Sequence, residues 1–231
     1  MIPRMAAPEP TRPAAQFAGG FETHITVDCD EEGLPGLQEW SSGAGMKLTH
    51  IMLGRGRMCS QIMLTCTGTG TLPEQHSAAV AAVRDVNAAG FRCTRVKIEA
   101  APGNADVPQD SDDAARLGSE FYFEHHIKLV MDPGIDLEPL LALVIPHTAH
   151  VSWNARRTTE NGTAERFVTQ RCHGVGRPEA TSRLADLTAI LGHHSYEIVS
   201  TVQEFVVFDS DATLDAGWID PDKYAEAVPT A

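Results

Sequence analysis

One short pattern occurs twice in this chain, and this repetition constrains the fold more than any other feature. Phe-Glu-x-His-Ile stands at residues 21–25 and again at 123–127, a little less than half of the 231 residues further on. Further matches follow in the same order at nearly the same separation: His50 with His150, Arg57 with Arg157, Cys66 with Cys172 and Glu99 with Glu204. Self-similarity at a fixed separation indicates a duplicated structural unit. The sequence therefore predicts two related halves.

Each half has the pattern of secondary structure expected for a ferredoxin-like unit. In the first half we expect strands at 21–29, 47–53, 61–66 and 92–100, with helices at 34–40 and 77–89. In the second half the strands fall at 121–131, 150–155, 166–172 and 196–208, and the helices at 137–144 and 178–191. Thr71 followed by Pro73 and Glu74 is typical of a helix start. We predict an α+β fold, an internal duplication of two ferredoxin-like βαββαβ repeats with antiparallel sheets.

The same patterns divide the chain into five segments. Residues 21–101 form the first repeat and 120–208 the second, with a cleft between them. Residues 102–119 contain Pro, Gly, Asn and several aspartates, so they read as a linker. Residues 1–20 are rich in proline and are expected to be a flexible arm, and 209–231 are an acidic tail.

Charge and composition exclude several classes of function. A net charge of −13 argues against binding to duplex nucleic acid. No apolar run is long enough to span a membrane, and residues 1–20 lack the apolar block of a signal peptide, so we expect a cytoplasmic protein without a membrane partner. The five cysteines form no CxxC spacing, which argues against zinc ribbons and disulfide frameworks.

The repeated strand carries polar side chains on one of its two faces. Side chains alternate along a strand, so Glu22, His24 and Thr26 share a face, and Glu124, His126 and Lys128 share the equivalent face. The apolar face is expected under the helices and the polar face on the open side of the sheet. Imidazoles flanked by carboxylates suit a site whose protonation is tuned near neutral pH.

The segment His24-Ile25-Thr26, preceded by Phe21, resembles the His-x-Thr strand motif of the 2H phosphoesterases, which include LigT-like RNA cyclic phosphodiesterases. The resemblance implies a hydrolase without a metal or other cofactor, acting on a small nucleotide or an RNA-end phosphate ester. It implies that His24 and His126 act as acid and base and that Thr26 holds phosphate. Lys128 stands where that family has Thr or Ser, which is a departure from the motif.

Further residues complete this predicted phosphoesterase site. Arg57 and Arg157 are expected to contact the phosphate, and Glu22 and Glu124 to orient the histidines. Neighbouring strands add three more candidates for substrate binding: Lys97, His50 and His150.

Two alternatives use the same residues. Glu22, His24, Glu124 and His126, with His50 or His150, are a ligand set for Zn, Mn, Fe or Ni in a metal-dependent enzyme. Alternatively the chain is a non-catalytic ligand-binding or assembly module. Ferredoxin-like sheets often pair through their open faces, so a homodimer is one possible assembly.

Overall fold

The computed structural model describes residues 15–156 and 162–219. The first repeat consists of β1 (Ala18–Asp28), α1 (Leu34–Gly43), β2 (Lys47–Leu53), β3 (Ser60–Thr71), α2 (Leu72–Ala88) and β4 (Arg92–Ala100). The second repeat consists of β5 (Tyr122–Met131), α4 (Glu138–Val144), β6 (Ala149–Asn154), β7 (Ala164–His173), α5 (Arg177–His193) and β8 (Glu197–Asp209). Three shorter elements are α3 (Ser111–Leu117), η1 (Ile145–His147) and η2 (Ala212–Asp215). This order confirms the predicted α+β fold with two ferredoxin-like repeats.

Parts of the three segments outside the repeats are also structured. β1 begins at Ala18, inside the expected arm, because Ala18 bridges to Ala105 and the Gln16 amide donates to Asp106. The expected linker contains α3, whose first turn is capped by Asp110, which accepts a hydrogen bond from the Asp113 amide. The expected tail contains η2. The described part of the expected arm therefore contacts the expected linker.

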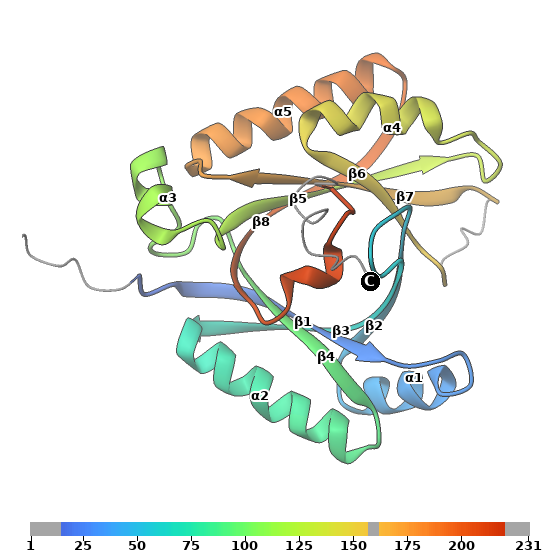
Figure 1. Cartoon of the computed structure of the whole chain (residues 1–231), viewed down its shortest axis with the longest axis vertical. Helices are drawn as coiled ribbons and strands as arrows, with labels where there is room; N and C mark the ends of the chain where they lie inside the picture. Colours follow the sequence, from blue (N-terminus) through green and yellow to red (C-terminus); the bar gives the residue numbers. More distant parts are fainter. Residues whose placement is uncertain (1–14, 157–161, 220–231) are drawn as a thin grey trace, which may run out of the picture.

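The two repeats share one closed barrel, so no cleft separates them. The strand order is β1-β3-β2-β6-β7-β5-β8-β4, and β4 pairs with β1 to close the ring. Two seams join the repeats: β2 with β6 at Ile51–Leu53, and β4 with β8 from Lys97 to Ala100. α1 and α2 lie on one side of the barrel and α4 and α5 on the other (Figure 1). Closure covers the sheet edges that two separate repeats would leave unpaired.

The outer faces of the strands pack against the helices, as their alternation predicts. In the first repeat Ile25 of β1 is buried with Leu37 of α1 and Val86 of α2. The second repeat has an equivalent cluster: Ile127, Leu129, Leu140, Leu187 and Leu191. Each large apolar side chain buried in this way contributes about 1.5–3 kcal/mol to stability.

The polar face of each repeat lies inside the barrel and not on an open side of the sheet. Glu99 and Glu124 are each 1% exposed, and Lys97 is 8% exposed. Because the edge strands pair across the repeats, the two polar faces are turned toward each other. Burial of charged groups is costly unless each has a partner, so the interior has to contain both signs of charge.

Across residues 15–156 and 162–219, no helix is both long enough and apolar enough to cross a bilayer.

Candidate functional site

In the first repeat, His24 of β1 lies between two carboxylates inside the barrel. Its Nε2 atom is 2.8 Å from Oε2 of Glu99 and 3.5 Å from Oε1 of Glu22. Its Nδ1 atom lies 2.8 Å from Oγ1 of Thr65, the residue paired with His24 on β3. The threonine fixes the ring so that Nε2 faces the carboxylates.

The second repeat has the equivalent arrangement around His126 of β5. Its Nε2 atom lies 3.4 Å from Oε1 of Glu124 and 3.4 Å from Oε2 of Glu204. Its Nδ1 atom lies 3.1 Å from Oγ1 of Thr169 on β7. The duplication has therefore placed two Glu-His-Glu groups in one barrel.

The two groups differ in one glutamate. Both oxygens of Glu124 lie in ion pairs, whereas among the described residues only Oε1 of its counterpart Glu22 does. Nζ of Lys97 lies 2.7 Å from Oε1 of Glu124, and Nε of Arg171 donates to Oε2 of Glu124 at 2.7 Å. Burial raises the pKa of Glu124, but the charges of Lys97 and Arg171 outweigh burial and hold this pKa well below its ordinary value. Glu124 is thus ionised and fully engaged.

Lys97 and Arg171 have no charged counterparts at the equivalent positions of the other repeat. β4 places Lys97 opposite His24, whereas β8 places Val202 opposite His126. β7 places Arg171 opposite Glu124, whereas β3 places Thr67 opposite Glu22. The ionised form of Glu22 is consequently less stabilised than that of Glu124. Burial raises the pKa of Glu22, and the attraction of His24 only partly offsets burial.

Glu99 has one oxygen without a hydrogen bond. Its Oε1 atom lies 2.7 Å from Nζ of Lys97, an ion-pair distance, yet among the described residues it has no hydrogen-bond partner because the direction is unsuitable. Burial raises the pKa of Glu99, but the charges of Lys97 and His24 lower it to about 2. This oxygen therefore already faces one cation, the ammonium of Lys97.

The ion-pair network around the two histidines contains more carboxylates than cations. Its ion-paired groups include six carboxylates, those of Glu22, Glu99, Glu124, Glu204, Asp209 and Asp215. Their partners besides the histidines are three cations, those of Arg95, Lys97 and Arg171. Burial lowers the pKa of His126, but the hydrogen bonds of Glu124 and Glu204 outweigh burial and raise it to about 10. The surplus therefore favours a positive charge at His126.

Three of these side chains could hold a metal ion. Glu99, His126 and Glu204 each offer one ligand atom, and the three atoms lie within 4.8 Å of one another. They come from β4, β5 and β8, which are neighbours in the barrel. Imidazole nitrogen with carboxylate oxygen suits first-row divalent metals.

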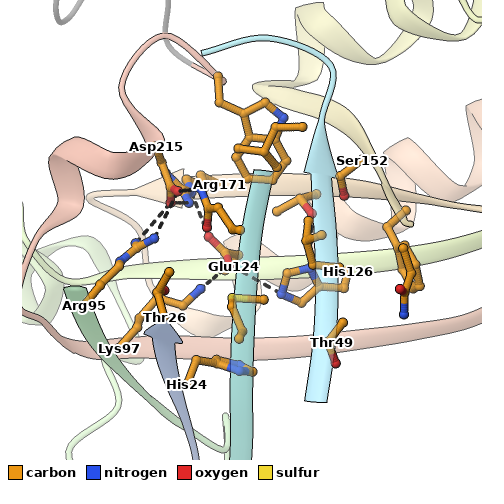
Figure 2. Close-up of a pocket in the computed structure, with 18 of the residues that line it drawn as sticks. His24, Thr26, Thr49, Arg95, Lys97, Glu124, His126, Ser152, Arg171 and Asp215 are labelled. Atoms are coloured by element: carbon orange, nitrogen blue, oxygen red, sulfur yellow. Dashed lines mark hydrogen bonds and ion pairs between the residues drawn. The ribbon is translucent and has the colours of Figure 1, made fainter. Parts of the chain in front are cut away.

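The candidate centre separates an interior cavity from an outer hollow. The interior cavity has a volume of about 250 Å³, and His24, Lys97, Glu124 and His126 are in its lining. Figure 2 shows Glu124 between Lys97 and His126, and Arg95 and Arg171 directed toward Asp215. The outer hollow is lined by Glu22, Glu99 and Glu204, among other residues. A metal at the centre could thus be reached from both sides.

The other two predicted catalytic residues also line the cavity. Thr26 is 2% exposed, and Lys128 donates to Oε1 of Glu165 at 2.9 Å. The lysine is therefore paired with a carboxylate.

Three predicted substrate-binding residues within the described ranges, His50, His150 and Arg57, are not brought to the centre. Nε2 of His50 lies 2.8 Å from Oγ of Ser60, and His50 is not in the cavity lining. His150 is 2% exposed, with Nδ1 3.2 Å from the Val151 carbonyl. Arg57 donates to Oγ1 of Thr213 at 2.7 Å, and Arg157 lies outside the described residues. The predicted metal set with His50 or His150 is therefore not assembled.

Sequence reasoning missed several residues of the site: Glu99, Glu204, Arg95, Arg171 and Asp215. The repeat did contain a signal for two of them, because Glu99 and Glu204 are matched positions. Arg171 and Asp215 have no counterpart in the other repeat, so no sequence pattern indicated them.

Comparison with known proteins gives distant similarities of fold. No protein-family model and no curated protein matches the chain. A chlorite dismutase from Candidatus Nitrospira defluvii in complex with imidazole is 11% identical, with a TM-score of 0.28, over 83% of this chain and 92% of that chain. A double mutant of the same enzyme is 13% identical, with a TM-score of 0.27, over 86% of this chain and 93% of that chain. Similarities this distant assign no activity here.

The predicted relation to the 2H phosphoesterases, and with it the hydrolase function, is wrong. The two solved structures named above are chlorite dismutases and not phosphoesterases. The geometry gives a physical reason for the correction: both imidazoles lie among carboxylates, which repel a phosphate group. Lys128, expected to hold phosphate, is neutralised by Glu165.

Proposed function

We propose that this protein binds one divalent first-row metal ion through Glu99, His126 and Glu204. The ion acts as a Lewis acid for a small polar molecule in the cavity. The observation that carries the proposal is the convergence of three ligand atoms within 4.8 Å of one another. Two ligands at ~2.1 Å from an ion are up to ~4.2 Å apart, so only small side-chain shifts are needed.

Charge supports a metal ion at this position. Without a metal, the carboxylates of Glu124 and Glu204 keep a proton on His126 and raise its pKa to about 10. A divalent ion supplies two positive charges where that proton supplies one. With Nδ1 donating to Thr169, Nε2 keeps its lone pair for the ion once the second proton has left.

The position of the centre supports a role beyond structure. Structural sites are closed by protein ligands, whereas catalytic sites keep a position for water or substrate. His126 lines the interior cavity, while Glu99 and Glu204 line the outer hollow. Three protein ligands leave the remaining coordination positions to small molecules from these two spaces.

Metal titration of protein dialysed against EDTA tests the proposal. We expect one equivalent of Mn²⁺ to bind. Binding is monitored by the loss of the free-ion signal in electron paramagnetic resonance. Glu204→Gln and His126→Gln each remove a ligand, so each raises the dissociation constant at least about tenfold. Water proton relaxation should show an exchangeable water on the bound Mn²⁺.

Glu179→Gln is the matched control, because Glu179 lies on α5 and pairs with Arg183, away from the barrel interior. It should bind Mn²⁺ like the wild type. If neither Mn²⁺ nor Zn²⁺ binds stoichiometrically, or if Glu179→Gln and Glu204→Gln weaken binding equally, the proposed centre is wrong.

A further inference from the structure

A carboxylate of this chain occupies a dedicated set of donors inside the barrel. Asp215, at the end of η2, is 6% exposed. Arg95 donates from Nη1 to Oδ1 and from Nη2 to Oδ2, each at 3.0 Å. Arg171 donates to Oδ2 at 2.6 Å, and Gln61 donates to Oδ1 at 2.9 Å. Two guanidinium groups and an amide thus hold both oxygens, the geometry that binds carboxylates most strongly.

The donors are held in place by contacts that do not involve Asp215. Nε of Arg95 donates to Asp209 at 2.8 Å, and Nε of Arg171 donates to Glu124 at 2.7 Å. The three donors lie on separate strands, Gln61 on β3, Arg95 on β4 and Arg171 on β7. They therefore form a preorganised carboxylate site in the barrel wall.

The donor site opens onto the interior cavity. Gln61, Arg95, Arg171 and Asp215 are all in the lining of the cavity of about 250 Å³. Apolar side chains outside residues 211–219 form another part of that lining: Ile51, Leu53, Met63 and Phe167. A molecule held by these donors would thus have an apolar surface beside its carboxylate.

When Asp215 occupies the donor site, two buried hydrogen-bond donors on or beside its segment lack partners. Nε1 of Trp218 and Nη2 of Arg55 are buried and have no hydrogen-bond partner among the described residues. Trp218 is 5% exposed and lines the same cavity. A buried donor without a partner opposes the state that buries it. A ligand that binds the same donors could therefore displace residues 211–219 from the cavity.

We propose that Arg95, Arg171 and Gln61 form a binding site for a small organic carboxylate with an apolar body, and that Asp215 fills this site when the ligand is absent. The incoming carboxylate takes over the hydrogen bonds of Asp215, and residues 211–219 move out of the cavity. This inference does not depend on the metal centre.

Asp215 competes with a free carboxylate for the donor site and so lowers the affinity of the site for that ligand. A group on the same chain acts at an effective concentration of roughly millimolar or more, so the wild type binds a free carboxylate weakly. Asp215→Asn removes the competing charge with little change of shape and leaves Arg95 and Arg171 without this anion. Free carboxylate should therefore bind the variant more tightly.

Benzoate is the probe, and benzamide is its uncharged control. Calorimetric titration uses EDTA-treated protein, so the outcome is separate from that of the metal proposal. Asp215→Asn should bind one benzoate with a dissociation constant at least roughly tenfold below that of the wild type. Asp211→Asn, a change on the same segment at a carboxylate that accepts from Thr213, should match the wild type. Benzamide should not bind.

Two results would overturn the proposal. The first is a folded Asp215→Asn protein, judged by circular dichroism, with no saturable benzoate binding or with equal binding of benzamide. The second does not depend on that variant: hydrogen exchange of residues 211–219 in the wild type should rise with benzoate and not with benzamide. Unchanged exchange at high benzoate would exclude displacement of Asp215.

Discussion

His24 and His126 occupy equivalent positions in the two repeats, yet their surroundings differ. Each has its Nδ1 atom against a threonine, Thr65 at 2.8 Å and Thr169 at 3.1 Å. Nε2 of His24 is 2.8 Å from Oε2 of Glu99, whereas Nε2 of His126 is 3.4 Å from its two nearest carboxylates. The contacts of His126 with its carboxylates are thus longer than the contact of His24 with Glu99, and the metal centre proposed above uses His126 for this reason.

Thr169→Val tests whether the threonine positions a metal ligand. The change removes the hydrogen-bond partner of Nδ1 of His126, so the ring loses its orientation. We expect the Mn²⁺ dissociation constant to rise about 10–100-fold. Thr65→Val makes the same change beside His24 and should leave that constant close to the wild-type value. Equal effects in the two variants would mean that the threonines act only on stability.

Lys97→Met tests the internal ion pairs. Nζ of Lys97 lies 2.7 Å from an oxygen of both Glu99 and Glu124, and these glutamates are 1% exposed. Removing one partner of a buried ion pair costs about 3–5 kcal/mol, because the remaining charges are left unpaired. Urea unfolding at pH 7 measures the change. Lys47→Met, at an exposed position, should alter stability by less than about 0.5 kcal/mol. A similar small change for Lys97→Met would contradict this account.

Phe123→Ala tests whether the barrel is one cooperative unit. Phe123 of β5 is fully buried, and its ring lies 4.7 Å from that of Phe205 in a cluster that also contains Phe21 of the first repeat and Phe17, which precedes β1. The cavity left by this change should cost about 3–5 kcal/mol. Unfolding should remain a single transition in which both repeats lose structure together. Val199→Ala, at a position 53% exposed, is the control and should have little effect. Two separate transitions would show that the repeats are independent.

Local patterns were enough to predict the order of the main elements within each repeat. The alternation of Phe21, Glu22 and His24 separated the outer face of β1 from its inner face, and Thr71 with Glu74 marked the start of α2, where Glu74 accepts from the Thr71 amide. These features depend on neighbours in the sequence. The internal duplication then transferred the same assignment to the second repeat.

The closure of the barrel could not be predicted in this way. The seam between β4 and β8 joins residues more than one hundred positions apart, such as Lys97 and Asp209. The ion pair of Lys97 with Glu124 exists only because of this closure. A polar face that looks solvated in one repeat becomes a buried, charged interior when a second repeat covers it.

The acid sensitivity of the Asp215 contacts follows from its pKa. Burial raises this pKa, but the charges of Arg171 and Arg95 outweigh burial and lower it below the ordinary value of 3.8. Because the folded-state pKa is depressed, the stabilisation is fully present above pH 3.8. It is lost as the pH falls from there through the folded-state pKa.

Urea unfolding of the wild type and of Asp215→Asn from pH 7 to pH 2 measures this effect. At pH 7 we expect the variant to be less stable by about 3–5 kcal/mol, because Arg95 and Arg171 lose a buried partner. The difference should shrink below pH 3.8, because the Asp215 carboxyl of the unfolded wild type takes up a proton there and this stabilises the unfolded state. Asp211→Asn keeps the cap of η2 and should follow the wild type throughout. A difference that stays constant to pH 2, or grows toward acid, would show that the carboxylate charge of Asp215 is not what holds residues 211–219 in the barrel.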